Sequence, residues 1–275
     1  MKYKVVCCKS ILLGSSLVLL FVIAFASPPS LQAQTTAAAE SSPATPLNKI
    51  PAGTILPVVL RTTFSFENCK AGEILHGKIA QEVPLPDGSA IRKGSLIEGH
   101  IVEVTPASQG HPQQVSLRFD KVRMSGQWVP VRTNLRAIAG FMEIQEAGVP
   151  TETPGEGEVE NWLPTMQIGG DTVYGADGPV MSADDTSKVI GKSVNDGVLV
   201  EPSAKEGTPC RGAVDGNEHP QALWVFSGDA CGAYGIEHLQ IVHAGRTNPE
   251  GTMILASARP KLKLTSGDGL LLRVD

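Results

Sequence analysis

The hydrophobic positions of this chain recur every second residue in many short stretches. Val115, Leu117 and Phe119 alternate with polar side chains, and the same pattern returns over 129–135 and 270–274. A period of two places successive side chains on opposite faces of a β-strand. Further strands are predicted at 54–62, 74–82, 96–105, 197–201, 222–227, 238–243, 252–258 and 260–264. After the N-terminal segment, only 183–192 is compatible with a short helix, so the sequence predicts an all-β fold.

Three similar turns precede predicted strands in the first half of the chain. Each contains a glycine, then a polar residue, then two aliphatic residues. The copies are Ala52-Gly53-Thr54-Ile55-Leu56, Ala71-Gly72-Glu73-Ile74-Leu75 and Lys93-Gly94-Ser95-Leu96-Ile97. Because glycine adopts positive φ without steric cost, we expect each copy to form a tight turn that opens one strand. A short hairpin is expected at Met124-Ser125-Gly126-Gln127. These regularly spaced turns between short strands favour a meander or a small barrel.

The acidic residues are concentrated in one segment. The formal net charge is −5, yet no Lys or Arg lies between Arg136 and Lys188. That span holds the acids Glu143, Glu146, Glu152, Glu156, Glu158, Glu160, Asp171, Asp177, Asp184 and Asp185. Within it, 145–165 is rich in Pro, Gly and Glu and is predicted to be a solvated linker. An acidic patch that binds cations or a basic partner is the alternative. We therefore expect a β-barrel-like domain at 50–144 and a second small β-sandwich or barrel domain at 166–275.

The N-terminus has the pattern of a secretory signal. Three lysines precede an uncharged apolar run from Ile11 to Ala26, and small residues follow. We expect a signal peptide over 1–33, with cleavage after Ala26 as an alternative, and a flexible tether over 34–49. The apolar run is shorter than the roughly 20 residues that span a bilayer, so an uncleaved anchor is less favoured. The predicted location is the periplasm, the outer membrane surface or the extracellular space.

The cysteines fit an exported protein. Two of the five lie in the signal segment. Cys210 and Cys231 are predicted to form a disulfide, because exported proteins meet an oxidising environment. Cys69 is left without a partner. We expect it to be a small buried residue, with an intermolecular disulfide or a reactive thiol as alternatives.

The best candidate for chemistry lies inside the loop that this disulfide would close. Val214-Asp215-Gly216-Asn217-Glu218-His219-Pro220 places two carboxylates beside an imidazole, and such groups perform general acid–base catalysis. The weak catalytic candidates are Asp215, Glu218, His219 and Asp229. The competing interpretation is a polar turn, which Asp, Gly and Asn favour.

Other motifs fail on their spacing. Gly191-Lys192-Ser193 lacks the earlier glycine of a phosphate-binding loop, since Thr186 stands there. The acids at 171–185 do not have the spacing of a calcium loop, and no HExxH or GxSxG motif is present. We therefore expect no metal, no cofactor and no nucleotide. The negative net charge argues against nucleic acid as a partner.

Two segments resemble a known family. Ile50-Pro51-Ala52-Gly53-Thr54-Ile55-Leu56-Pro57-Val58-Val59-Leu60 and Ile91-Arg92-Lys93-Gly94-Ser95-Leu96-Ile97-Glu98-Gly99 are similar to the β-barrel domain of conjugal-transfer and type IV secretion outer-membrane-complex proteins. The similarity covers 50–105, and Arg92 stands where that family usually has proline. The resemblance implies a small β-barrel in the cell envelope with a scaffolding role.

These features together predict a non-enzymatic exported β protein of the cell envelope. It would act as a binding or structural module, and its partner would be an envelope protein or a glycan. One alternative is a secreted hydrolase, for instance one directed at glycans, with its site around Asp215 and His219. Another is a metal or small-ligand carrier that uses the acidic segment.

Overall fold

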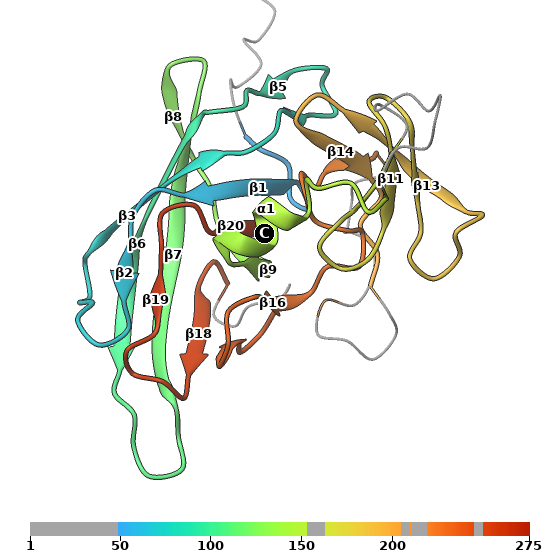
Figure 1. Ribbon diagram of the computed structural model, residues 1–275. Helices are drawn as coiled ribbons and strands as arrows, with labels where there is room; N and C mark the ends of the chain where they lie inside the picture. The colour runs from blue at the N-terminus through green and yellow to red at the C-terminus, as the bar shows by residue number, and fades with distance from the viewer. Residues whose placement is uncertain (1–48, 153–162, 205–209, 211–218, 245–249) are drawn as a thin grey trace, which may run out of the picture. The chain divides into compact units, whose positions relative to one another are not determined.

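The computed structural model describes residues 49–152, 163–204, 210, 219–244 and 250–275 (Figure 1). The predicted signal peptide and all but the last residue of the predicted tether lie outside this part of the chain. The described residues are almost all strands and turns, with one short helix, α1 (Phe141–Glu146). The all-β prediction is confirmed. The short helix is at 141–146 and not at 183–192, where β13 (Val189–Val194) begins instead.

The larger sheet has ten strands. They are β1 (Ile55–Leu60), β3 (Ile74–Ile79), β6 (Leu96–Thr105), β7 (Gln113–Met124), β8 (Gln127–Pro130), β9 (Thr133–Ala139), β16 (Gly232–Tyr234), β17 (Leu239–Ile241), β18 (Met253–Ser257) and β20 (Gly269–Val274). Their order across the sheet is β16-β9-β20-β1-β3-β6-β7-β18-β17, and β8 pairs with β7. All neighbours are antiparallel except β16 and β9.

This larger sheet is rolled around a hydrophobic core. β9 lies near one end of the strand order, yet it also lies against β7 and β18 near the other end. Phe66 and Phe119 are fully buried inside, together with aliphatic side chains of β1, β3, β6 and β7. Each fully buried side chain of this size contributes about 1.5–3 kcal/mol. We call this the rolled sheet.

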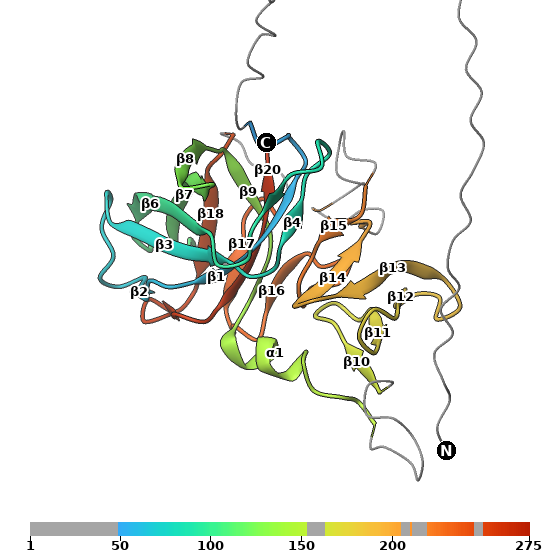
Figure 2. The same cartoon turned by 90° about the horizontal axis from the view of Figure 1, so that it is seen from above.

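The second sheet has six strands that follow one another in chain order (Figure 2). They are β10 (Pro164–Met166), β11 (Thr172–Tyr174), β12 (Pro179–Met181), β13, β14 (Gly197–Val200) and β15 (Gln221–Ala222). Every neighbouring pair is antiparallel. We call it the meander sheet. Two short pairs complete the β-structure: β2 (Phe64–Ser65) with β19 (Lys263–Leu264), and β4 (Val83–Pro84) with β5 (Ala90–Ile91).

A second hydrophobic core joins the two sheets, and β20 takes part in both cores. Leu270 and Leu272 belong to the core inside the rolled sheet, whereas Leu271 belongs to the second core. Val200 and Phe226, from the other side, are fully buried in that second core. β20 is buried on both faces along Leu270-Leu271-Leu272, a short apolar run of the kind found in central strands.

The predicted linker at 145–165 separates strands that pair with one another. β20 lies between β1 and β9, and β18 pairs with β7. All described residues fall within one compact unit. The change of composition at 145–165 marks the point where the chain passes from the rolled sheet to the meander sheet. The hydrophobic pattern within a short window does not show which distant strands pair. The pairing of β18 with β7, and of β20 with β1 and β9, was therefore not predicted from the sequence.

The predicted strand-opening turns are confirmed. Gly53, Gly72 and Gly94 have φ values of 85°, 86° and 80° and precede β1, β3 and β6. The N–H of each glycine donates to a carbonyl of a neighbouring strand, at 2.7–2.8 Å. Gly251, with φ of 71°, also precedes a strand, β18, but its N–H donates to the Asp275 side-chain carboxylate at 2.9 Å.

The predicted hairpin is confirmed, whereas two of the predicted strands differ from those in the structure. Ser125 and Gly126 form the expected two-residue turn between β7 and β8, both at positive φ. The alternation at 129–135 is split between β8 and β9, which have different partner strands. The strand predicted at 222–227 ends at Ala222, because the chain turns at Trp224.

Candidate functional site

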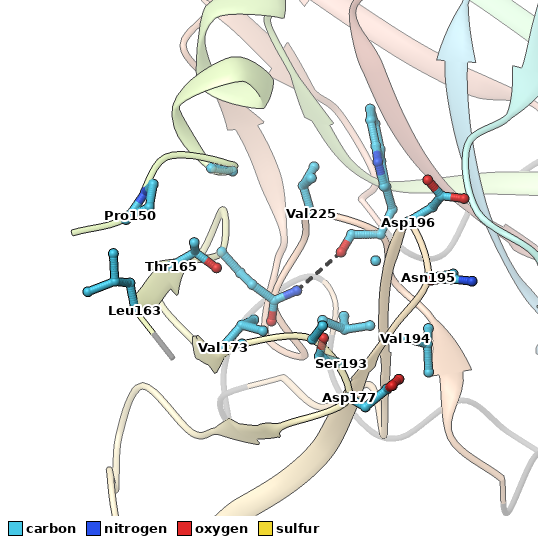
Figure 3. Close-up of a pocket in the computed structure, with 17 residues that line it drawn as sticks. Pro150, Leu163, Thr165, Val173, Asp177, Ser193, Val194, Asn195, Asp196 and Val225 are labelled. Carbon is cyan, nitrogen blue, oxygen red and sulfur yellow. Dashed lines mark hydrogen bonds between the residues drawn. The ribbon is translucent and has the colours of Figure 1, made fainter. Parts of the chain in front are cut away.

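The candidate site is a pocket of about 530 Å³ beside the meander sheet (Figure 3). β10, β11, the turn between β13 and β14, and the segment after β15 contribute to its wall. The apolar part includes Leu163, Val173 and Val225, and the polar part includes Thr165 and Ser193. Its size lies within the roughly 300–1,000 Å³ of small-ligand pockets.

Trp224 lines this pocket in a backbone conformation that bulky residues rarely adopt. Its φ is 56°, which costs on the order of 1–3 kcal/mol unless the surroundings hold it. The fully buried Gln81 stabilises this conformation, because its Oε1 accepts the Trp224 N–H at 2.6 Å. The same side chain donates from Nε2 to the Val198 carbonyl at 2.8 Å. Gln81, the second residue after β3, therefore fixes the turn that forms one wall of the pocket.

Gln167 is a second buried amide in the pocket wall. Its Nε2 donates to the Phe226 carbonyl at 2.9 Å and to the Trp224 carbonyl at 3.4 Å. These bonds determine which end of the amide is nitrogen. Its Oε1 is buried and has no hydrogen-bond partner among the described residues, and the residue is 6% exposed. A buried acceptor without a donor costs about 1–3 kcal/mol.

Asp177 and Asp196 are the ionisable residues that line the pocket. Both are at positive φ, at 59° and 69°, which Asp tolerates better than most residues. Asp196 forms an ion pair with Lys93, which comes from the turn before β6. That ion pair ties the β13–β14 turn to the rolled sheet. The pocket wall is therefore rich in acceptors, with carboxylates, an amide carbonyl and hydroxyl groups, and it contains no Lys, Arg or His among the described residues.

His219 and Asp229, the predicted catalytic residues that the structure describes, do not line this pocket. Asp215 and Glu218 lie outside the described residues. His219 is exposed, and its backbone carbonyl accepts a hydrogen bond from Gln221 Nε2 at 2.8 Å. Asp229 accepts the Ser203 hydroxyl at 2.6 Å. Neither of the two described candidates lines the pocket of Figure 3.

The disulfide between Cys210 and Cys231 is confirmed. It lies beside the buried Arg136, whose carbonyl is 3.4 Å from Cys210 Sγ. Arg136 occupies the point where the register between β9 and β20 shifts. Its Nη2 donates to the carbonyls of Ser203, at 2.7 Å, and Gly228, at 3.3 Å. Burial lowers the pKa of Arg136 to about 10, so the side chain stays charged at neutral pH.

The other buried charge in this region is Asp171. Its two oxygens accept the N–H groups of Ala183, at 2.9 Å, and Gly228, at 2.7 Å. Burial raises the pKa of this carboxyl, and the two hydrogen bonds act in the opposite direction. One of the acids counted in the predicted acidic patch is thus a buried structural group. Three others, at 156, 158 and 160, lie outside the described residues.

The raised pKa of Asp171 predicts how its contribution to stability depends on pH. The folded protein takes up the proton at higher pH than the unfolded chain, whose Asp titrates near 3.8. As the pH falls through that window, the free energy of unfolding of the wild type should rise relative to Asp171→Asn. Urea unfolding of both proteins from neutral pH to about pH 3.5 measures the difference.

Asp185→Asn is the matched control for this prediction. Hydrogen bonds from the Ser187 side chain and backbone lower the pKa of Asp185. The wild type should therefore lose stability relative to Asp185→Asn over the acid range, the opposite sign. A wild-type advantage over Asp171→Asn that shrinks with falling pH would contradict the assignment.

The described residues contain no group of three or more His, Cys, Asp or Glu side chains placed to hold a metal ion. Among them no helix has the length and apolar character needed to cross a bilayer. Cys69 is unpaired and buried, as expected, and burial raises the pKa of its thiol.

The residues that shape the pocket were not predicted from the sequence. Gln81, Gln167 and Trp224 are far apart in the chain and belong to no motif. The one local signal was Asn195-Asp196-Gly197, a turn sequence that is typical of a hairpin.

The fold and the site define an all-β protein with one acceptor-rich pocket beside its six-stranded sheet. In the comparisons with known proteins, no family model, curated protein or solved structure matches the chain.

Proposed function

We propose that this protein is a non-enzymatic, exported module of the cell envelope that binds a neutral glycan in the pocket of Figure 3. The observation that carries the proposal is the composition of the pocket wall, which combines apolar side chains with the acceptors of Asp177, Thr165 and Ser193 and contains no Lys, Arg or His among the described residues. Export is supported by the predicted signal peptide and by the disulfide between Cys210 and Cys231, since disulfides persist in oxidising compartments. The resemblance to secretion-complex barrels remains a prediction about the same compartment.

The chemistry of the wall favours a ligand that donates hydrogen bonds. Asp177 and the hydroxyls of Thr165 and Ser193 offer acceptors. Sugars carry many O–H donors, and acetamido sugars add N–H donors. Val173 and the other apolar residues of the wall complement the C–H faces of such a ring. An anionic ligand is disfavoured because the ionisable residues of the wall are both acids.

Calorimetric titration with the tetrasaccharide of N-acetylglucosamine tests this proposal. We expect saturable binding to the wild type. Thr165→Phe places a ring in the pocket from the edge strand β10, where an aromatic side chain suits the strand. Its affinity should fall at least about tenfold, which corresponds to about 1.4 kcal/mol.

Gln145→Leu is the matched control. Gln145 is exposed on α1 and does not line the pocket, so its variant should bind as the wild type does. Equal loss in both variants, or no effect of Thr165→Phe, would contradict the assignment to this pocket. Release of reducing ends from the tetrasaccharide would favour the hydrolase alternative instead, and variants His219→Ala and Asp229→Asn would then locate its site.

A further inference from the structure

A second concave surface lies between two tight turns of the rolled sheet. One is the turn that opens β6, with Gly94 at φ 80°, and the other is the Ser125–Gly126 turn between β7 and β8. Together they enclose about 560 Å³. The Gly94 N–H is bound to the Ile79 carbonyl at 2.8 Å, and Met124 pairs with Gln127. Because both turns are fixed by hydrogen bonds, this surface is pre-organised for binding.

The charge of this surface is opposite to that of the pocket in Figure 3. Three cations, Arg92, Lys93 and Arg123, line it, and no described acid does. Lys93 is held by Asp196. Arg92 and Arg123 are exposed and form no ion pair within the described part of the chain. We call this surface, lined by Arg92, Lys93, Ser95, Arg123 and Ser125, the basic groove.

Two unpaired arginines at one groove favour oxyanions. A guanidinium presents several N–H donors in a plane and binds carboxylate or phosphate with two parallel hydrogen bonds. Ser95 and Ser125 add hydroxyl groups from the two turns. In a chain of net charge −5, two arginines at one groove with no ion-pair partner in the described part of the chain mark a local positive field that attracts anions.

An exposed tryptophan continues the surface beyond the groove. Trp128 on β8 lies directly opposite Arg123 on β7, so the two side chains share one face of the hairpin. Trp128 is 42% exposed. The ammonium of Lys121 lies 5.0 Å from the centre of its ring, and Lys121 is held in turn by Glu98 at 2.6 Å. The indole is thus ordered, and it offers a flat apolar surface beside the arginines.

We propose that the basic groove binds an acidic polysaccharide. Carboxylate groups of the polymer would pair with Arg92 and Arg123, and a sugar ring would lie against Trp128. A concave groove and a single exposed indole on this face favour a polymer chain over a lipid surface. This site is separate from the pocket of Figure 3, to which Arg92, Arg123 and Trp128 do not contribute.

Calorimetric titration of the full protein with alginate oligosaccharide, a polyuronate, tests the proposal. We expect binding that weakens as salt is added, because salt screens exposed charges, and no binding of neutral dextran. The double variant Arg92→Gln/Arg123→Gln should lose at least about tenfold in affinity, since hydrogen bonds to charged groups are the strong ones. Trp128→Ala should lose a smaller factor.

Arg61→Gln is the matched control, because Arg61 is exposed and lies outside the groove. Its affinity for alginate should stay within about twofold of the wild type. Equal loss in Arg61→Gln and the double variant would indicate non-specific attraction and would overturn the proposal. Binding to phosphatidylglycerol vesicles without binding to alginate would overturn it in favour of a membrane surface. Circular dichroism of each variant confirms that the fold is retained.

Discussion

A chain that ends at residue 144 is expected to be unfolded, although it contains every strand of the first domain predicted from the sequence. β20 lies between β1 and β9, so its removal leaves both of those strands without their shared partner. The core of the rolled sheet also loses Leu270, Leu272 and Val274. Each lost side chain removes about 1.5–3 kcal/mol, and a domain is stable by only about 5–15 kcal/mol.

Circular dichroism and the dispersion of amide proton resonances measure this outcome. The chain from residue 45 to 275 is the matched control, because it contains every described strand. It should show a cooperative unfolding transition, whereas the chain ending at 144 should show none. A cooperative transition of the shorter chain would mean that 50–144 is an independent domain, as the composition suggested.

The second large effect is expected at Arg136. Replacement by Met keeps most of the side-chain volume but removes the N–H donors to the carbonyls of Ser203 and Gly228. The Ser203 carbonyl loses its bond to a charged group, a kind of bond worth about 1.5–3 kcal/mol, whereas the Gly228 carbonyl keeps the Ser203 N–H as a donor at 2.8 Å. We expect Arg136→Met to lower the free energy of unfolding by about 1.5–3 kcal/mol, measured by urea denaturation.

Arg259→Met is the control for this substitution. Arg259 is exposed, and its ion pair with Glu237 spans 3.5 Å between largely exposed groups, a kind of contact worth about 0–1 kcal/mol. Its variant should therefore remain close to the wild type. A stable Arg136→Met protein would show that Arg136 does not hold the loops at 203 and 228 to β9.

The elements of the fold were largely predictable because their signals are local. Period-two alternation located β1, β3, β6 and β7 within a few residues, and the glycine turns marked the starts of three strands. The disulfide was predictable from two cysteines in a chain with a predicted export signal. In each of these cases the sequence within a short window carries the physical cause.

Sheet order was not predictable, because it depends on contacts between distant segments. Nothing near Leu271 indicates that its strand inserts between β1 and β9. The turn at Trp224 was not predicted either. The segment 222–227 has the composition of a strand, but hydrogen bonds of Trp224 with Gln81 and Gln167 stabilise it as a turn. Tertiary contacts override local propensity at such positions.

The candidate site was hidden for the same reason. The residues predicted as catalytic candidates from the sequence were Asp215, Glu218, His219 and Asp229. The pocket is instead shaped by two buried glutamines, whose importance arises from the backbone groups that they meet. Glutamines have no spacing rule in sequence. Only the assembled sheet shows that one amide oxygen at 167 is left without a partner.

The side-chain amide resonances of Gln167 test the central claim most directly. Nitrogen-15 correlation spectra record both N–H protons of this group, and these protons are bound to the carbonyls of Phe226 and Trp224. On addition of the N-acetylglucosamine tetrasaccharide, we expect these resonances to shift in proportion to saturation, while those of the exposed Gln145 stay in place. Binding that leaves the Gln167 resonances unmoved would contradict binding in this pocket.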